Sequence, residues 1–178
     1  MSPASLSIDI DGPSPAVSAE ALSALGKETF TDTFGHLYSP ENLQKFLTGS
    51  HNVDAYASIL SDPSYGVWTA TTKDGELIGY LVAGPCKLPV DDLPANAGEL
   101  ARFYIKTDFQ GGGLGNRMLD LALAWLHQNF SHVYLSVYSE NHKAQRLYER
   151  RGFQKVQRYH FMVGDHADPE FIMKHIAV

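Results

Sequence analysis

A glycine-rich turn between a predicted strand and a predicted helix constrains the fold of this chain most. Residues 110–116 read QGGGLGN, after an apolar run at residues 100–105 and before a helical pattern at residues 114–129. Glycines lack Cβ atoms, so backbone N–H groups in such a turn can approach an anion closely. The helix start adds unpaired N–H groups and the positive end of the helix dipole. We therefore predict a site that holds a pyrophosphate against the backbone.

Two common phosphate-binding patterns do not fit this turn. A P-loop requires Lys-Ser or Lys-Thr after its last glycine, but Asn116 and Arg117 follow Gly115. A dinucleotide-binding fingerprint requires G-x-G-x-x-G in the first strand–turn–helix unit, whereas this turn lies past the middle of the chain. The spacing that does fit is Q-x-x-G-x-G, from Gln110 to Gly115. A turn that merely joins a strand to a helix is the simpler alternative.

A second block, NHKAQRLYERRGF, occupies residues 141–153. Asn141 has the side chain of a helix N-cap, and Gly152 suits the left-handed residue that follows a helix. Ala144 and Tyr148 are four residues apart and therefore share one helical face. The simpler interpretation of Tyr148 is an aromatic side chain that packs in the core and has no role in a site.

Together the two blocks resemble the acetyl-CoA signature of the GNAT acetyltransferase superfamily, in the same order and spacing. The resemblance implies an α/β (α+β) fold: a mixed, mostly antiparallel, twisted sheet of about seven strands, flanked by helices and splayed at the central strand. It implies acetyl-CoA as co-substrate. The cofactor-binding positions that it implies are Phe103, Tyr104, Ile105, Gln110, Gly111, Gly112, Gly113, Leu114, Gly115, Asn116, Asn141 and Ala144.

The resemblance also implies two catalytic residues. Tyr148 matches the tyrosine that protonates the departing thiolate, and a phenol with a pKa of about 10 can do so. Glu99 matches a glutamate that receives the proton of the amine through water. Alternatively, Glu99 is a solvated carboxylate at the end of a strand without a catalytic role. A relay of water molecules could then accept the proton of the amine in place of a single side chain.

Three longer segments are similar to PaiA-type spermidine/spermine acetyltransferases: GKETFTDTFGHLYSPENLQKFL, ARFYIKTDFQGGGLGNRML and FMVGDHADPEFIMKHI. This resemblance implies a small-molecule amine as acceptor, with Asp32 and Tyr38 as substrate contacts. An exposed helical face is the alternative for Asp32. Another small amine, a peptide N-terminus or a non-catalytic acyl-CoA-binding regulator remain alternatives for the function.

Composition limits the partners and the compartment. At 178 residues, the chain is predicted to form a single domain. A net charge of −6 disfavours nucleic acid as a binding partner, because a protein that binds nucleic acid needs a basic surface. No apolar run is long enough for a membrane span, and the N-terminus lacks the pattern of a secretory signal. One cysteine allows no internal disulfide, which fits the cytoplasm. The eight histidines are scattered, so we expect no metal, and a homodimer is left open.

Hydrophobic periodicity predicts the elements. Predicted strands cover residues 5–10, 66–72, 76–83, 99–105, 132–138 and 153–163, with a short last strand at 170–175. Predicted helices cover residues 17–33, 54–60, 114–129 and 141–151, and a further helix begins at Ser39-Pro40-Glu41. In that further helix, Leu43, Phe46 and Leu47 are predicted to form a buried stripe.

Overall fold

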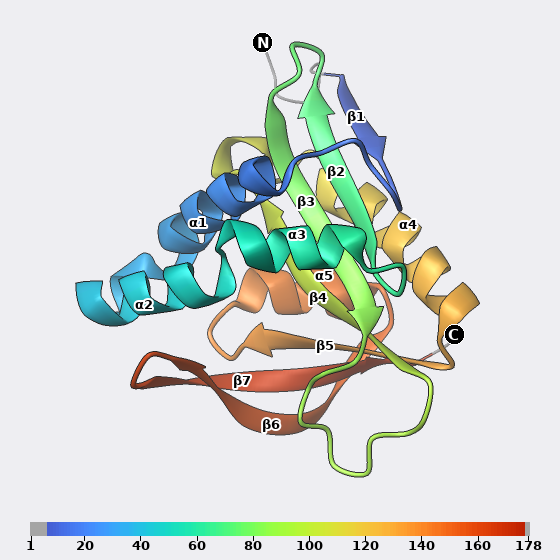
Figure 1. Ribbon diagram of the computed structural model, residues 1–178. Coiled ribbons are helices and arrows are strands. Elements are labelled where there is room, and N and C mark those ends of the chain that lie inside the picture. The colour runs from blue at the N-terminus through green and yellow to red at the C-terminus, as the bar shows by residue number, and fades with distance from the viewer. Residues whose placement is uncertain (1–6, 177–178) are drawn as a thin grey trace.

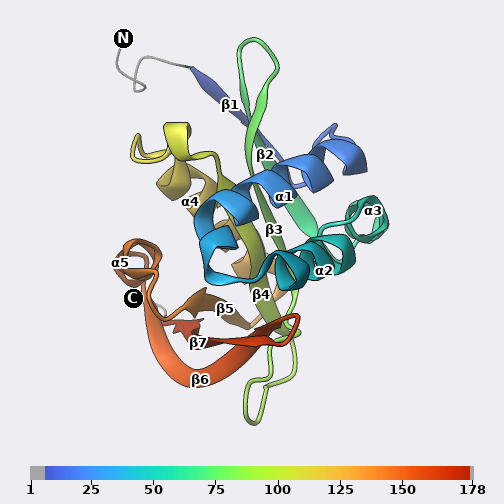
Figure 2. The ribbon, with the colours of Figure 1, turned by 90° about the vertical axis from the view of Figure 1, so that its left-hand side faces the viewer.

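The computed structural model describes residues 7–176 and contains one seven-stranded sheet with helices on both faces (Figures 1 and 2). The strands, in the order β1-β2-β3-β4-β5-β7-β6, are β1 (Ile8–Asp11), β2 (Gly66–Thr72), β3 (Leu77–Pro85), β4 (Ala97–Ile105), β5 (His132–Tyr138), β6 (Phe153–Val163) and β7 (His166–His175). The α-helices are α1 (Ala19–Phe34), α2 (Pro40–Ser50), α3 (Val53–Ser61), α4 (Leu114–Asn129) and α5 (His142–Arg150). Two short 3-10 helices, η2 (Gly35–Leu37) and η3 (Thr107–Phe109), complete the described part of the chain. The predicted fold class is confirmed.

The sheet separates at its centre, between β4 and β5. These neighbours run parallel, and they pair only from Ala97↔His132 to Leu100↔Leu135. Beyond that point, β4 stays paired with β3, and Ala101 is the extra residue of a bulge opposite Val82 and Ala83. A bulge bends and twists its strand locally. The backbone edge of residues 101–105 that faces β5 is therefore left without a strand partner.

Apolar side chains of the helices pack against both faces of the sheet. α4 covers one face with side chains that are buried almost completely, namely Leu114, Met118, Leu119, Ala122 and Leu126. α1 and α3 cover the other face, where Leu22, Leu25 and Tyr56 pack against Val67, Tyr80 and Val82. Because β3 lies between these layers, its residues 78–84 are buried on both faces. No helix within residues 7–176 is long and apolar enough to cross a membrane.

Side-chain caps begin four of the five α-helices in the described part of the chain. The N-cap side chains of Ser18, Ser39, Asn52 and Asn141 each accept a hydrogen bond from the backbone N–H three residues further on. These caps satisfy N–H groups that a helix start leaves free. α4 differs, since it begins at Gly113 with no side-chain cap and no acidic residue in its first turn.

The predicted elements need three corrections. The first strand is Ile8–Asp11 rather than 5–10, and residues 5 and 6 lie outside the described residues. β7 begins at His166, because it pairs with β6 along its whole length. Leu43, Phe46 and Leu47 are only partly buried, since α2 lies beside α1 and β6 and covers no face of the sheet.

Candidate active site

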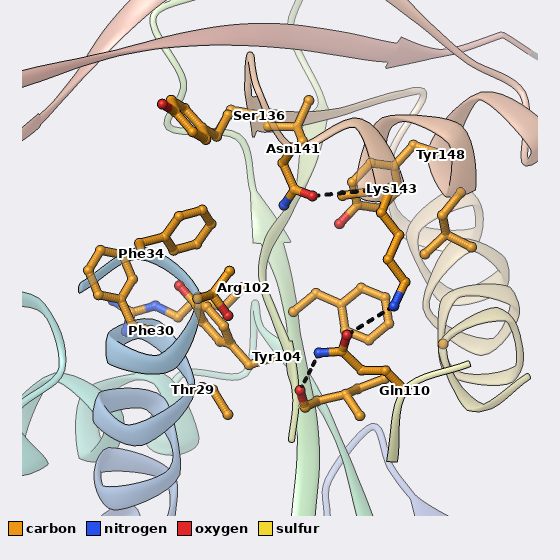
Figure 3. Close-up of a pocket in the computed structure, with 18 of the residues that line it drawn as sticks. Thr29, Phe30, Phe34, Arg102, Tyr104, Gln110, Ser136, Asn141, Lys143 and Tyr148 are labelled. Carbon is orange, nitrogen blue, oxygen red and sulfur yellow. Dashed lines mark hydrogen bonds between the residues drawn. The ribbon is translucent and has the colours of Figure 1, made fainter. Parts of the chain in front are cut away.

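A cavity of about 690 Å³ opens where β4 and β5 separate. Figure 3 shows Phe30 and Phe34 of α1 on one side of it, and Gln110, Lys143 and Tyr148 on the other. We call its two parts the glycine end and the aromatic end. The glycine end comprises Gln110, Gly111, Gly113, Gly115, Asn116, Asn141, Lys143, Ala144 and Leu147. The aromatic end comprises Phe30, Phe34, Tyr38, Phe46, Phe161, Asp168 and Glu170.

The glycine end presents open backbone. Gly111 and Gly113 have φ values of 88° and 86°, a left-handed conformation that glycine adopts without a steric penalty. A Cβ atom added at Gly111, Gly112 or Gly113 would meet no heavy atom within 4 Å. The turn therefore has free space above it and leads into the uncapped start of α4. Unpaired amides and a positive helix end are the chemistry that binds an anion.

A side-chain bridge ties this turn to α5. The Gln110 Nε2 donates to the Ile105 carbonyl oxygen at 2.8 Å, and the Lys143 Nζ donates to Gln110 Oε1 at 3.1 Å (Figure 3). The Asn141 Oδ1 accepts from the Ala144 backbone N–H at 3.3 Å and so begins α5. The bridge places an ammonium group beside the open amides, where it adds positive charge to the same end of the cavity.

Tyr148 combines a buried ring with access to the cavity. The residue is 8% exposed, and its ring packs against Phe153 with 5.9 Å between the ring centroids. Burial raises the pKa of the Tyr148 hydroxyl above its ordinary value. The group therefore stays a protonated phenol, which is a proton donor, in the cavity lining.

The aromatic end combines rings with carboxylates. Phe30 stacks on Tyr38 with 5.9 Å between the ring centroids, and Phe46 meets Phe161 edge-on at 5.6 Å. Asp168 is only 3% exposed, and its Oδ2 accepts a hydrogen bond from the Tyr38 hydroxyl. Its Oδ1 lies 3.1 Å from His166 Nε2 but has no donor in hydrogen-bond geometry among the described residues. This end thus holds a buried carboxylate oxygen with unused accepting capacity.

Glu170 is the second carboxylate of the aromatic end. It lies two residues after Asp168 on β7, so both side chains share one face of that strand. The Tyr159 hydroxyl donates to Glu170 Oε1 at 3.4 Å. Burial raises the pKa of Glu170 from 4.5 to about 7, and the neighbouring Ser136 hydroxyl opposes this rise. The carboxylate is therefore placed to exchange a proton near neutral pH.

A polar cluster supports the cavity floor from the α1 side. The Arg102 Nη1 donates to the Ser50 carbonyl oxygen at 2.7 Å, and its guanidinium lies 4.9 Å from the centroid of the Tyr56 ring. The Tyr56 hydroxyl contacts His51 Nδ1 at 2.8 Å. Burial, followed by the charge of Arg102, lowers the pKa of His51 to about 3, so this histidine is neutral. The cluster anchors β4 next to its bulge.

Most of the predicted site residues meet in this one cavity. Those that line it are Asp32, Tyr38, Phe103, Tyr104, Ile105, Gln110, Gly111, Gly113, Gly115, Asn116, Asn141, Ala144 and Tyr148. Gly112 lies at the turn but not in the lining, and Leu114 points into the core with 5% exposure. Glu99 lies outside as well: it lines a separate pocket of about 410 Å³, where its Oε1 accepts from the Lys87 backbone N–H at 2.8 Å.

Several polar residues of the cavity were not found from the sequence, and the charged ones are Arg102, Lys143, Arg150, Asp168 and Glu170. The Asp168-Pro169-Glu170 triplet carried a usable signal, because alternate residues of a strand share a face. The predicted last strand began only at residue 170, so the pairing of the two carboxylates was missed. Within residues 7–176, no group of three histidine, cysteine or acidic side chains is arranged to hold a metal ion.

Comparison with known proteins identifies the class. The model of the acetyltransferase (GNAT) family matches residues 27–153. An uncharacterized N-acetyltransferase in the pepI 3′ region of Lactobacillus delbrueckii subsp. lactis is 32% identical over 160 residues, which cover 85% of this chain and 87% of that protein. The spermine/spermidine N(1)-acetyltransferase of Bacillus subtilis is 35% identical over 83 residues, 46% of this chain and 55% of that protein.

Solved structures show the same fold. The PaiA N-acetyltransferase of Thermoplasma acidophilum, in complex with coenzyme A, superposes with a TM-score of 0.71 at 21% identity, covering 96% of this chain and 99% of that one. NAA60 of Arabidopsis thaliana, with a bisubstrate analogue, gives a TM-score of 0.70 at 16% identity, covering 95% and 98%. The chain therefore belongs to the acetyltransferase (GNAT) family and is an acetyl-CoA-dependent N-acetyltransferase.

Proposed function

We propose that this enzyme transfers the acetyl group to a primary amine of a polyamine, such as spermidine or spermine, by direct attack in a ternary complex. The observation that carries the proposal is the aromatic end, where rings and two carboxylates share one wall of the cavity. Methylene chains pack well against aromatic rings, and ammonium groups are attracted both to carboxylates and to ring faces. A polyamine carries both features along its length.

The glycine end fits coenzyme A. The open amides of Gly113 to Asn116 and the Lys143 ammonium suit a pyrophosphate, and α4 leaves its first N–H groups without a side-chain cap. The unpaired edge of β4, from Phe103 to Ile105, offers backbone groups for the amides of the pantetheine arm. The bound co-substrate supplies the activated acetyl group at the middle of the cavity.

Tyr148 is proposed to donate the proton that the departing sulfur needs. Its phenol lines the cavity, and its raised pKa keeps it protonated. Backbone N–H groups beside the β4 bulge are suited to hold the developing oxyanion. Glu99 as proton acceptor stays a prediction, with a water relay as its alternative.

The polyamine acceptor is also supported by the partial similarity to the Bacillus subtilis enzyme, whose name states that it acts on spermine and spermidine. The cytoplasmic location and the homodimer stay predictions.

The test is a thiol-release assay with acetyl-CoA and a panel of amines, with mass spectrometry of the products. The panel holds spermidine, spermine, a monoamine of matched length, an aminoglycoside and a short peptide. We expect a single acetylation of spermidine and spermine, with kcat/KM at least tenfold above that of the monoamine. Turnover of the peptide or aminoglycoside alone would replace the polyamine as acceptor. Acetyl-CoA binding without turnover of any amine would favour an acyl-CoA-binding regulator.

A further inference from the structure

We propose that the carboxylate of Glu170 takes the proton from the acceptor ammonium before the amine attacks. The proposal rests on the amine acetylation proposed above and assigns its proton acceptor to a residue of β7. Glu170 lines the aromatic end of the cavity beside Asp168, so an ammonium held by these two carboxylates would touch the group that deprotonates it.

The position of Glu170 follows from the splay of the sheet. Leu135 is the last residue of β5 that pairs with β4, and Ser136 follows it at the opening. Ser136 and Tyr138 pair with Ile172 and Glu170 of β7. β5 thus lies between β4 and β7, and Glu170 lines the cavity from the far side of β5.

Tyr104 of β4 lines the same cavity as Glu170 and Tyr148. Burial raises the pKa of Tyr104, the charge of Arg102 opposes this rise, and Glu170 and Tyr148 add to it. Because the carboxylate of Glu170 and the phenol of Tyr148 line one cavity, the proposal assigns them as the proton acceptor and the proton donor of one reacting centre.

The groups around Glu170 favour a carboxylate that changes charge near neutral pH. Asp168, two residues away, raises the pKa of Glu170 further, whereas the Tyr159 hydroxyl of β6 and the Ser136 hydroxyl of β5 lower it. Other titratable or charged groups also lie at this end. Tyr38 and His166 contact Asp168. Tyr138 of β5 and Arg102 and Tyr104 of β4 line the cavity. Arg102 is turned to Ser50 and Tyr56, so no cation of the cavity wall is recorded in an ion pair with Glu170 among the described residues.

The proton balance is complete with groups already present. Glu170 takes H⁺ from R–NH₃⁺, and the free electron pair of the amine forms a bond to the thioester carbonyl carbon. The C–S bond then breaks with its electron pair on sulfur, and the Tyr148 hydroxyl gives its proton to that sulfur. The resulting phenolate takes the second proton from the acylated nitrogen, and Glu170 releases its own proton to solvent.

Glu99, the glutamate predicted from the sequence, lies in a different setting. It is in the part of β4 that still pairs with β5, opposite Tyr134, and it lines the smaller pocket. One carboxylate oxygen already accepts the Lys87 backbone N–H. Glu99 is therefore less well placed than Glu170 to meet an amine in the large cavity.

The experiment measures kcat/KM for spermidine between pH 5.5 and about 9 in the wild type and in Glu170→Gln. In the wild type, we expect kcat/KM to fall below about pH 7 and to level above it, because Glu170 must be ionised to act. In Glu170→Gln, only the neutral amine can attack. Its kcat/KM should rise about tenfold per pH unit without levelling below the amine pKa of about 10. At pH 7 we expect a loss of about 10²-fold to 10⁴-fold.

Two further variants keep the result decisive. Ser136→Ala removes a hydroxyl that lowers the pKa of Glu170, so the break in the profile should move to higher pH while the plateau is retained. Glu20 is an exposed residue in the first turn of α1, so Glu20→Gln should have the same pH profile of kcat/KM as the wild type.

Glu170→Gln should also have a higher Tm than the wild type above pH 7. The folded pKa of Glu170 is raised, so the wild type loses stability as the pH rises through about 7.

The outcomes separate this inference from the proposed function. If the wild type acetylates no amine, the proposed function fails. If the wild type is active and Glu170→Gln keeps both its rate and the break near pH 7, Glu170 is not the proton acceptor. If Glu99→Gln removes that break instead, the role belongs to Glu99 and the inference is overturned.

Discussion

The two ends of the cavity are built in opposite ways. The glycine end comes from two short continuous segments, 110–116 and 141–147, and offers mainly backbone groups and a helix start. The aromatic end comes from side chains of α1, α2, β6 and β7 and from Tyr38 between η2 and α2, which are far apart in the sequence. Spacing and glycine chemistry specify the first end locally, whereas the second exists only after the sheet has formed. A co-substrate site can thus stay constant in a fold on which acceptor sites vary.

The largest expected effect is at Tyr148. Tyr148→Phe removes the hydroxyl that is proposed to donate the proton, while leaving the ring in its packing against Phe153. We expect kcat to fall by about 10²-fold to 10⁴-fold, which is the contribution that a general acid makes to a rate. The Kd for acetyl-CoA should change less than about threefold. Tyr134→Phe, a buried tyrosine outside the cavity lining, is the matched control. An unchanged kcat in Tyr148→Phe would exclude the role of the phenol.

A change at the aromatic end should affect the amine alone. Asp168→Asn keeps the shape and an oxygen for the Tyr38 hydroxyl but removes the buried charge. We expect KM for spermidine to rise by about tenfold or more, since an interaction with a charged group contributes roughly 1.5–3 kcal/mol. KM for acetyl-CoA should stay the same, and Asp74→Asn at the exposed turn before β3 is the control. Equal losses for spermidine and acetyl-CoA would show that the two ends are not separate.

A change at the glycine end should have the opposite selectivity. Gly113→Ala places a Cβ on a residue with φ of 86°, and Gly75→Ala does the same in a surface turn with φ of 85°. Neither Cβ would meet another atom within 4 Å, so both variants should lose about 1–2 kcal/mol of stability from backbone strain. Only Gly113→Ala should weaken acetyl-CoA binding, by roughly tenfold in a calorimetric titration. Equal affinities in the two variants would remove the glycine turn from the binding site.

The smallest effect concerns a local support of the aromatic end. Ser39 caps α2 by accepting from the Asn42 N–H at 3.1 Å. Ser39→Ala should cost about 1 kcal/mol of unfolding free energy in urea, as N-cap losses do. Because the cap touches no cavity group, kcat/KM for spermidine should change by less than twofold. A tenfold loss would mean that the position of α2 is part of acceptor binding.

The features that could be predicted from the sequence are the local ones, as at the glycine end of the cavity. The turn at 110–116, the cap at Asn141 and the left-handed Gly152 were predictable because each depends on a few neighbouring residues. The Ser39-Pro40 helix start was predictable for the same reason. The partial exposure of Leu43 and Phe46 was not, since it depends on where α2 lies relative to the sheet.

The two carboxylates considered as proton acceptor show the limit most clearly. The resemblance implied Glu99, which lies in the part of β4 that pairs with β5 and lines the smaller pocket. Glu170 lines the cavity from β7, which pairs with the edge of β5 that faces away from β4. A strand order that is not sequential along the chain cannot be read from local patterns.

The most direct test of the whole account is a crystal structure with coenzyme A and spermidine bound together. The account predicts the pyrophosphate on the amides of residues 113–116, the sulfur beside the Tyr148 hydroxyl and a spermidine nitrogen within hydrogen-bond distance of Glu170. Spermidine bound in the pocket beside Glu99, or a sulfur remote from Tyr148, would contradict it.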